Sequence, residues 1–329
     1  RLRRASHWYP FLRLLPESVS GAPVTYGDEE WSWLQGTTFA NRARLLLNKH
    51  KRQYETVAGL VPWFGKNFTL EEFLWARSIV SSRLYSAKKM LDVAPEHRRA
   101  IVPIGDMFNH QIPASVSWGY NRSSDTFDFW MRQNVQAGQA LYISYGDKKH
   151  AEFMISKGFV PSVARKENYT ECDVDVRMRI DGAPDETAKR KLIADVTGIP
   201  SRAFQPPVFR LQNSWDGEAG KMLAYARLLM LPPDPWEAQG KKMANASKDI
   251  LQQCQERISD ANEQAALEWC LQAVRDTLNS YPTSLEEDEK LLLRLEGPLL
   301  YLVALRRDEK LGLRMWEDKF MSALEMCGG

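Results

Sequence analysis

The feature that most constrains the fold of this chain is a hydrophobic pattern that changes twice along its length. Between residues 28 and 85, apolar side chains recur every three or four residues, which is the spacing of amphipathic helices. Between residues 100 and 159 the pattern changes to short apolar runs separated by turn residues, which indicates strands. Helical spacing returns after Pro161, and the change between Pro161 and Ala188 is the best candidate for a domain boundary. The chain is therefore predicted to be an α+β protein of two domains.

Local signals place the ends of several elements. Thr69 and Glu72 have the spacing of a capping box, so a helix is expected from Leu70 to about Arg83. A second helix is expected to begin at Asp147 and to end at Gly158, because glycine is favoured just past a helix end. Further capping boxes are predicted at Asp260 with Glu263 and at Ser284 with Glu287. The other expected elements are strands at 101–104, 117–120, 126–132 and 140–144, and helices at 185–196, 217–230, 260–280 and from 285 onward.

Charge, cysteine spacing and hydropathy exclude several classes of function. The formal net charge of +2 over 329 residues, without a basic cluster, predicts no nucleic-acid partner. Four scattered cysteines without metal-ligand spacing predict no metal site and favour a reducing, intracellular compartment. The most apolar stretch, residues 291–305, is interrupted by charged residues and by a Gly-Pro pair, so no membrane association is expected. The cysteines are Cys172, Cys254, Cys270 and Cys327.

The remaining candidates for chemistry are polar residues that follow short strands. The sequence has no P-loop, no GxSxG, no HExxH and no GxGxxG that opens a helix. It does have Asp106 to His110 after an apolar run and Tyr145 at the end of another. Taken alone, Asn109 and His110 are more often a satisfied turn, and Tyr145 is more often a half-buried aromatic. These residues by themselves predict no function.

In order, however, they resemble a known family. The matching segments resemble those of the SET-domain protein methyltransferases related to the Rubisco large-subunit lysine methyltransferase, and the resemblance extends over nearly the whole chain from Trp8. The segments are 68–83, 102–110, 137–147, 150–152 and 158–159, then Tyr281-Pro-Thr-Ser-Leu-Glu-Glu-Asp288 and Arg307-Asp-Glu-Lys310.

The resemblance implies a fold and a domain order. Residues 1–160 would form a SET domain of small twisted β-sheets, with a helical insertion at about 27–85. Residues 161–329 would form an all-α substrate-binding domain that docks a protein substrate. A glycine-containing segment holds part of the cofactor in this family, and it has no counterpart here, so it is expected ahead of Arg1.

The resemblance also implies the residues of a site for S-adenosyl-L-methionine. Tyr145 would be the catalytic residue beside the sulfonium methyl. Arg83 would pair with the carboxylate of the cofactor, although an arginine at a helix end is otherwise more often a surface ion pair. Phe159 would close the opposite side, which is compatible with a place in the core. The expected cofactor-binding residues are Arg83, Asp106, Met107, Phe108, Asn109, His110, Gly158 and Phe159, and the expected substrate-channel residues are Tyr85, Tyr120 and Ile143.

The acceptor is predicted to be a lysine side chain of a protein. The similar actin-histidine methyltransferase branch carries a Trp at the place of Gly105 and an Asn at the place of Tyr85, and this chain has neither. The run Gly119 to Asn121 does resemble that branch, so histidine is the first alternative. Lys157 stands where many lysine-modifying members have Tyr, which keeps a catalytically inactive interaction module as the second. The expected compartment is the cytoplasm, or the plastid stroma if the source is a plant or alga.

Overall fold

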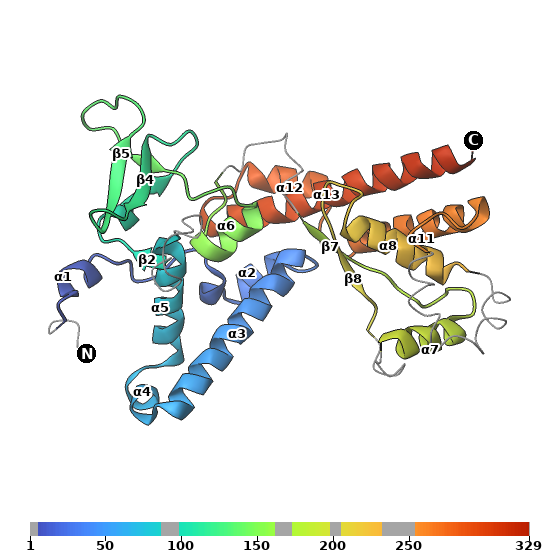
Figure 1. The fold of residues 1–329 in the computed structure, drawn as a ribbon, viewed down its shortest axis with the longest axis horizontal. Coiled ribbons are helices and arrows are strands. Elements are labelled where there is room, and N and C mark those ends of the chain that lie inside the picture. The colour runs from blue at the N-terminus through green and yellow to red at the C-terminus, as the bar shows by residue number, and fades with distance from the viewer. Residues whose placement is uncertain (1–5, 87–98, 162–172, 198–204, 232–253, 329) are drawn as a thin grey trace. The chain divides into compact units, whose positions relative to one another are not determined.

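The computed structural model describes residues 6–86, 99–161, 173–197, 205–231 and 254–328. Figure 1 draws the chain coloured by residue number, and its contacts divide it into two compact units. Unit 1 comprises residues 1–34, 39–165 and 292–305, and unit 2 comprises residues 35–38, 166–291 and 306–329. The predicted α+β class is confirmed, since helices and small sheets are both present. The division into residues 1–160 and 161–329 stays a prediction.

One helix of unit 1 begins and ends where the sequence predicts. Helix α5 covers Leu70–Arg83, as predicted, and Thr69 forms the capping box with Glu72. The Thr69 hydroxyl accepts a hydrogen bond from the Glu72 amide at 3.2 Å, and the Glu72 carboxylate accepts one from the Thr69 amide at 2.9 Å. The other helical elements are α1 (Tyr9–Leu12), η2 (Pro23–Thr25), α2 (Asp28–Trp33), α3 (Thr38–Leu60), α4 (Pro62–Asn67) and α6 (His150–Lys157).

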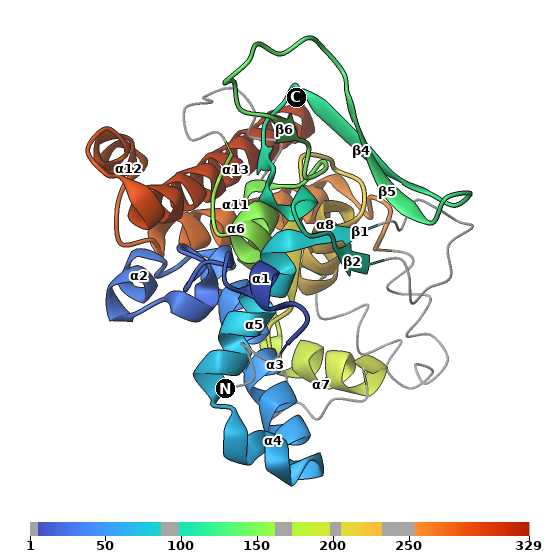
Figure 2. The ribbon, with the colours of Figure 1, turned by 90° about the vertical axis from the view of Figure 1, so that its left-hand side faces the viewer.

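Three two-stranded sheets make up the β part of unit 1. Strands β1 (Leu84–Ser86) and β2 (Arg99–Ile101) pair antiparallel, whereas β3 (Asn109–His110) and β6 (Tyr142–Ile143) pair parallel. Strands β4 (Val116–Asn121) and β5 (Thr126–Met131) form an antiparallel hairpin, which is plain in Figure 2. The predicted strands at 117–120 and 126–132 are thus confirmed. Tyr85, Val116 and Ile143 form a small core that joins the three sheets.

Two predictions in this region need correction. Residues 102–104 do not continue a strand, because the Asp106 amide donates to the Val102 carbonyl at 2.8 Å and the chain turns into the 3-10 helix η4, Gly105–Met107. Ile104 takes a left-handed φ of 73° in that turn, which is rare for a β-branched residue. Helix α6 begins at His150 rather than at Asp147, and its N-cap is Lys149. Its predicted end at Gly158 is confirmed, with a φ of 80°.

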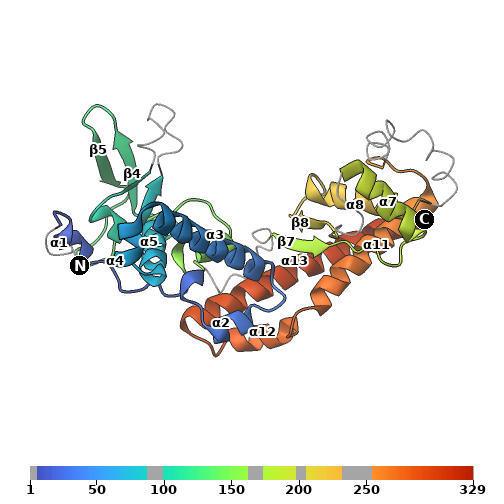
Figure 3. The same ribbon diagram turned by 90° about the horizontal axis from the view of Figure 1, so that it is seen from below.

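Unit 2 is mainly helical, but the expectation of an all-α domain is wrong because it also contains a two-stranded sheet. Strands β7 (Val174–Arg177) and β8 (Val208–Leu211) pair antiparallel. In β7 the buried residues Val174 and Val176 alternate with more exposed ones, a period-two pattern that the sequence already contains. Helices α8 and α11 contact this ladder, as Figure 3 shows. The helices are α7 (Glu186–Thr197), α8 (Glu218–Leu229), α11 (Asp260–Asn279), α12 (Leu285–Leu292) and α13 (Gly297–Gly328), of which the first turns of α13 are counted with unit 1.

Of the two capping boxes predicted in unit 2, one is confirmed and the other is wrong. The capping box of Ser284 with Glu287 is confirmed, with the Ser284 amide 2.6 Å from the Glu287 carboxylate. The box at Asp260 is wrong, because Ser259 is the N-cap of α11 and its hydroxyl accepts from the Asn262 amide. A serine at the N-cap competes well with an adjacent aspartate, since both accept backbone hydrogen bonds there.

Two kinds of feature are absent from the described part of the chain. Within it, no helix combines the length and the apolarity needed to cross a bilayer. Nor do three or more His, Cys, Asp or Glu side chains gather in it as a metal site would require. Its cysteines, Cys254, Cys270 and Cys327, are free, and Cys172 lies outside the described residues.

Candidate functional site

A cavity of about 580 Å³ lies in unit 1, where the end of α5, the turn after β2 and the segment from β6 to α6 meet. Its volume is within the range typical of sites for small molecules. The predicted site residues that line it are Arg83, Tyr85, Asp106, Phe108, Ile143 and Tyr145. These six residues lie up to 62 positions apart in the chain (from 83 to 145), and the fold brings them together at one cavity.

Arg83 and Asp106 form the charged centre of the cavity wall. The Arg83 guanidinium donates to the Asp106 carboxylate and to the Asp106 backbone carbonyl, both at 3.1 Å. The Asp106 side chain is fully buried, and that of Arg83 is 20% exposed. Arg83 Nε and Asp106 Oδ1 are buried and have no hydrogen-bond partner among the described residues. Buried polar atoms are normally satisfied, so the two unsatisfied atoms mark this pair as an unusual feature of the cavity wall.

Tyr145 is held at both its backbone and its hydroxyl. Its hydroxyl donates to the Phe108 carbonyl at 2.7 Å, and its amide donates to His110 Nδ1 at 3.1 Å. The rings of Tyr145 and His110 stack with centroids 5.2 Å apart. Burial raises the pKa of Tyr145, and the positive charge of Arg83 partly opposes this rise. Burial lowers the pKa of His110. Both side chains are therefore neutral near pH 7, and His110 serves as an acceptor that orients the loop carrying Tyr145.

The other predicted cofactor residues lie behind or beside the cavity rather than on its wall. Phe159 packs edge-on against Tyr145 at 6.3 Å. Gly158 approaches the segment before η2 so closely that a Cβ added to it would lie 2.5 Å from the Ser20 carbonyl oxygen. Met107 and Asn109 are both exposed. None of these four residues, nor His110, lines the cavity.

Of the predicted channel residues, Tyr85 and Ile143 line the cavity and Tyr120 does not. Tyr85 is buried, lines the cavity and donates its hydroxyl to the Gly105 carbonyl. Burial and the nearby Tyr145 and Asp106 raise the pKa of Tyr85. Tyr120 lies on β4 and donates its hydroxyl to Asp125 at the hairpin turn, so the structure does not bring it to the cavity wall.

Two lysines contribute positive charge that the sequence-based site did not include. Lys157, the last residue of α6, donates from Nζ to the Ser82 carbonyl at 2.8 Å and lies 4.7 Å from the centroid of the Tyr145 ring. Burial, with the charges of Lys148 and Arg83, lowers the pKa of Lys157 to about 8. Lys148 donates to the Tyr145 carbonyl, and burial lowers its pKa too. Both lysines line the cavity.

The buried ammonium of Lys157 leads to a prediction about stability. Its pKa of about 8 lies below its ordinary value of 10.5, so the unfolded chain binds this proton more tightly. The resulting cost to stability is present below pH 8 and fades as the pH rises from about 8 to 10. Lys157→Met is expected to raise the free energy of unfolding at pH 7 by about 1–3 kcal/mol, after the loss of the bond to Ser82 is counted.

Urea denaturation measures the difference in the free energy of unfolding between variant and parent. It is carried out at about pH 6.5, 7.5 and 9.5, so that the measurements extend from below to above the lowered pKa of Lys157. Lys66→Met, at an exposed position on α4, is the matched control and is expected to change little at any pH. A variant that is less stable than the parent at pH 7, with a difference that does not depend on pH, would contradict the buried-ammonium interpretation.

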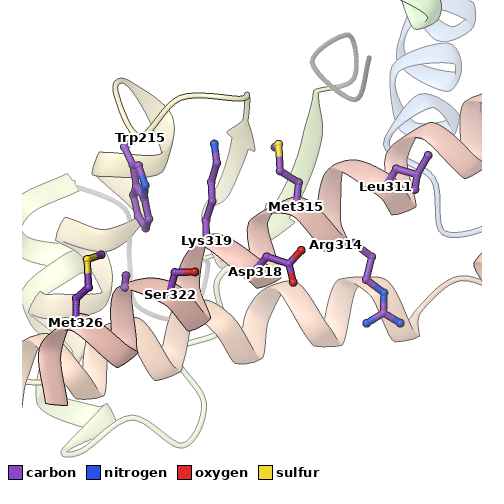
Figure 4. A pocket seen from close by; sticks show the side chains of 9 residues that line it. Trp215, Leu311, Arg314, Met315, Asp318, Lys319, Ser322 and Met326 are labelled. Carbon is purple, nitrogen blue, oxygen red and sulfur yellow. The ribbon is translucent and has the colours of Figure 1, made fainter. Parts of the chain in front are cut away.

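A second cavity, of about 650 Å³, lies in unit 2 and is shown in Figure 4. One face of α13 lines it together with Trp215. Lys319, one of the lining residues, also makes a cation-π contact with the ring of Trp316. This second cavity contains none of the residues predicted for the site. The cavity in unit 1 is therefore the candidate active site.

Several known proteins are similar to this chain in sequence. Residues 187–315 match the family model described as Rubisco LSMT substrate-binding. The chain is 25% identical to actin-histidine N-methyltransferase of Rhinolophus ferrumequinum over 300 residues, which cover 87% of this chain and 48% of that protein. The corresponding proteins of Mus musculus and Homo sapiens are 25% and 24% identical, with the same coverage. The chain thus spans about half the length of the curated relatives it matches.

Solved structures give the same result for the fold. The SET domain of LSMT bound to lysine and AdoHcy superposes with a TM-score of 0.69 at 20% identity, covering 99% of this chain and 74% of that one. Rubisco LSMT bound to AdoMet gives a TM-score of 0.68 at 20% identity, with the same coverage. The resemblance found in the motifs is confirmed: this is a chain with the SET fold of the Rubisco LSMT structures. Residues 187–315 match the model of the substrate-binding family named after the same enzyme.

Proposed function

We propose that this chain transfers a methyl group from S-adenosyl-L-methionine to a side-chain nitrogen of a protein. The observation that carries the proposal is the cavity in which Arg83, Asp106 and Tyr145 converge, in a chain with the fold of an AdoMet-bound Rubisco LSMT. Arg83 Nε and Asp106 Oδ1 are buried without a partner among the described residues, and the guanidinium and carboxylate that carry them have the chemistry to pair with a carboxylate and an amino group. The helical unit 2 would dock the protein substrate, as its family match suggests.

The residues of the chain have a modest chemical task in such a reaction. When bound, S-adenosyl-L-methionine supplies a methyl carbon that is already activated by a positively charged sulfur, so no strong acid and no metal are required. Arg83 would hold the carboxylate, and the stacked pair of His110 and Tyr145 would fix the loop beside the reacting centre. Alignment of nucleophile and methyl can lower a barrier by roughly 7–11 kcal/mol.

The acceptor that we propose first is lysine. Gly105 supports it, because the histidine-modifying branch is expected to have a Trp here, and even a Cβ at this position would lie 2.5 Å from Phe129 Cζ, so a neighbouring side chain would have to shift. Tyr85, where that branch has Asn, is buried at the cavity wall. Histidine is the second candidate, and the similarity to actin-histidine N-methyltransferases favours it.

Peptide arrays methylated with S-adenosyl-L-methionine, followed by mass spectrometry of the modified residue, separate these acceptors. Label on lysine nitrogen supports the first candidate. Label confined to imidazole nitrogen would replace lysine by histidine and keep the reaction type. Absence of S-adenosyl-L-methionine binding by calorimetry would leave an inactive interaction module as the better account of the fold.

The role of Arg83 gives a prediction about cofactor affinity. Arg83→Lys is expected to weaken S-adenosyl-L-methionine binding by about 10-fold or more, because a lysine cannot make the planar, two-point contact with a carboxylate. Lysine is preferred to alanine here because alanine would leave the buried Asp106 carboxylate unpaired and would confound binding with folding. Calorimetry measures the affinity, and Arg122→Lys at an exposed hairpin position is the control. Equal affinities of parent and Arg83→Lys would remove the carboxylate role.

A further inference from the structure

We propose that Lys157 is itself a methyl acceptor, so that the chain methylates its own cavity wall when S-adenosyl-L-methionine is bound. The inference rests on the proposed function and adds a modification site to it. A primary amine is already present inside the cavity, beside the residue that the proposal places next to the transferable methyl group.

The position of the amine is set by helix α6. Lys157 is the last residue of that helix, and the following Gly158 turns the chain away with a left-handed φ of 80°. The side chain therefore extends into the cavity, where Nζ lies 4.7 Å from the Tyr145 ring centroid and 2.8 Å from the Ser82 carbonyl oxygen. Burial and these two contacts limit the positions that the amine can take.

The electrostatic surroundings favour the nucleophilic form of the amine. The charged groups that act on it are Lys148, from the loop before α6, and Arg83, from the end of α5. Both are positive, and the buried Asp106 carboxylate is already paired with Arg83. Together with burial they lower the pKa of Lys157 to about 8, so a substantial fraction is neutral near physiological pH. One N–H of the neutral amine donates to Ser82, which leaves the lone pair free to react.

The proposed step is a direct displacement. The Nζ lone pair forms a bond to the methyl carbon while the bond from carbon to sulfur breaks, and its electron pair stays on sulfur. The products are S-adenosyl-L-homocysteine and a methylated ammonium, which releases its extra proton to solvent. Monomethyl-lysine retains N–H groups, so the hydrogen bond to Ser82 can persist after the reaction.

Lys148 provides an internal comparison. It also lines the cavity, but its Nζ donates to the Tyr145 carbonyl and lies 5.7 Å from the Phe153 ring centroid. Burial lowers the pKa of Lys148, but the Glu152 carboxylate opposes that shift, whereas the charges that act on Lys157 all lower its pKa. Lys157 is thus expected to react in preference to Lys148.

The test uses the whole chain and S-adenosyl-L-methionine with a trideuterated methyl group. After incubation and digestion, mass spectrometry is expected to find the label on Lys157, with a first-order rate that dilution of the protein does not change. Lys157→Arg is expected to abolish this label, and Lys66→Arg to retain it. The rate should rise about tenfold between pH 7 and pH 9, following the neutral fraction of an amine with a pKa of about 8.

Calorimetry with S-adenosyl-L-homocysteine separates the two proposals. Binding without label at Lys157, or with label at Lys148 alone, would overturn the inference and leave the proposed function standing. Equal labelling of the heat-denatured chain would overturn it too, because the modification would then be chemical. Absence of binding, together with absence of label, would overturn both.

Discussion

Tyr145→Phe is expected to lower turnover by on the order of 100-fold while it leaves the affinity for S-adenosyl-L-methionine nearly unchanged. The substitution removes one oxygen, which is fixed in the cavity wall by its hydrogen bond to the Phe108 carbonyl at 2.7 Å. The ring that stacks on His110 and contacts Phe159 is kept. The loss should therefore fall on positioning at the reacting centre rather than on cofactor binding.

Initial rates of methyl transfer to an unmethylated acceptor peptide, together with calorimetry, measure the two quantities separately. Tyr142→Phe is the matched control, because Tyr142 lies on the same strand region but does not line the cavity. Unchanged turnover in Tyr145→Phe would show that Tyr145 is not the catalytic residue. A parallel loss of cofactor affinity would instead assign its hydroxyl to the structure of the site.

Asp288→Ala is expected to lower the free energy of unfolding of unit 2 by about 3–5 kcal/mol, the usual cost of breaking a buried ion pair by removing one partner. The Asp288 side chain is fully buried. It accepts hydrogen bonds from Arg306 Nε at 3.0 Å, from Lys310 at 2.6 Å and from the Thr283 hydroxyl at 2.8 Å. Without it, two cations that are almost fully buried would lose their counter-charge.

Chemical denaturation followed by circular dichroism at 222 nm (a standard helix signal, and unit 2 is mainly helical) tests this expectation. Glu289→Ala is the matched control, because Glu289 is the neighbouring carboxylate and is exposed. It is expected to change stability by less than about 0.5 kcal/mol. Equal effects of the two substitutions would contradict the idea that the buried network holds this unit together.

This network explains why one motif could be recognised but not understood from the sequence. The segment Tyr281 to Asp288 and the segment Arg307 to Lys310 were matched only as family landmarks. In the structure they meet, because Tyr281 donates to Glu309 at 2.7 Å and Lys310 donates to Asp288. Their pairing depends on two helices, α12 and α13, that turn back on each other, and no local pattern in either segment contains that information.

Prediction of elements succeeded where the cause is local. Helix α5 follows from the Thr69 capping box, and the β4–β5 hairpin follows from its apolar pattern. The strand at 101–104 failed because a hydrogen bond to Val102 turns the chain into η4. The β7–β8 ladder was missed although Val174 and Val176 alternate with more polar residues. Four-residue strands give a weak signal beside long helical stretches.

Prediction of the site shows the same limit. Motif order placed Arg83, Asp106 and Tyr145 together, and they do line one cavity. The hairpin position of Tyr120 did not reveal that its hydroxyl would bond to Asp125 instead. In the sequence, Lys157 was identified only as a departure from the Tyr of many lysine-modifying members. A lysine in the last turn of a helix is usually solvated, where it interacts with the helix dipole. The burial of Lys157 depends on α5 packing beside α6, which only the tertiary structure provides.

The central claim is that the cavity of unit 1 binds the methyl donor, and a structure of the chain determined with S-adenosyl-L-homocysteine tests it most directly. We expect the ligand in the cavity lined by Arg83, Asp106 and Tyr145, with its carboxylate on Arg83 and its sulfur facing Tyr145. A ligand bound elsewhere, or an empty cavity at saturating ligand, would contradict it.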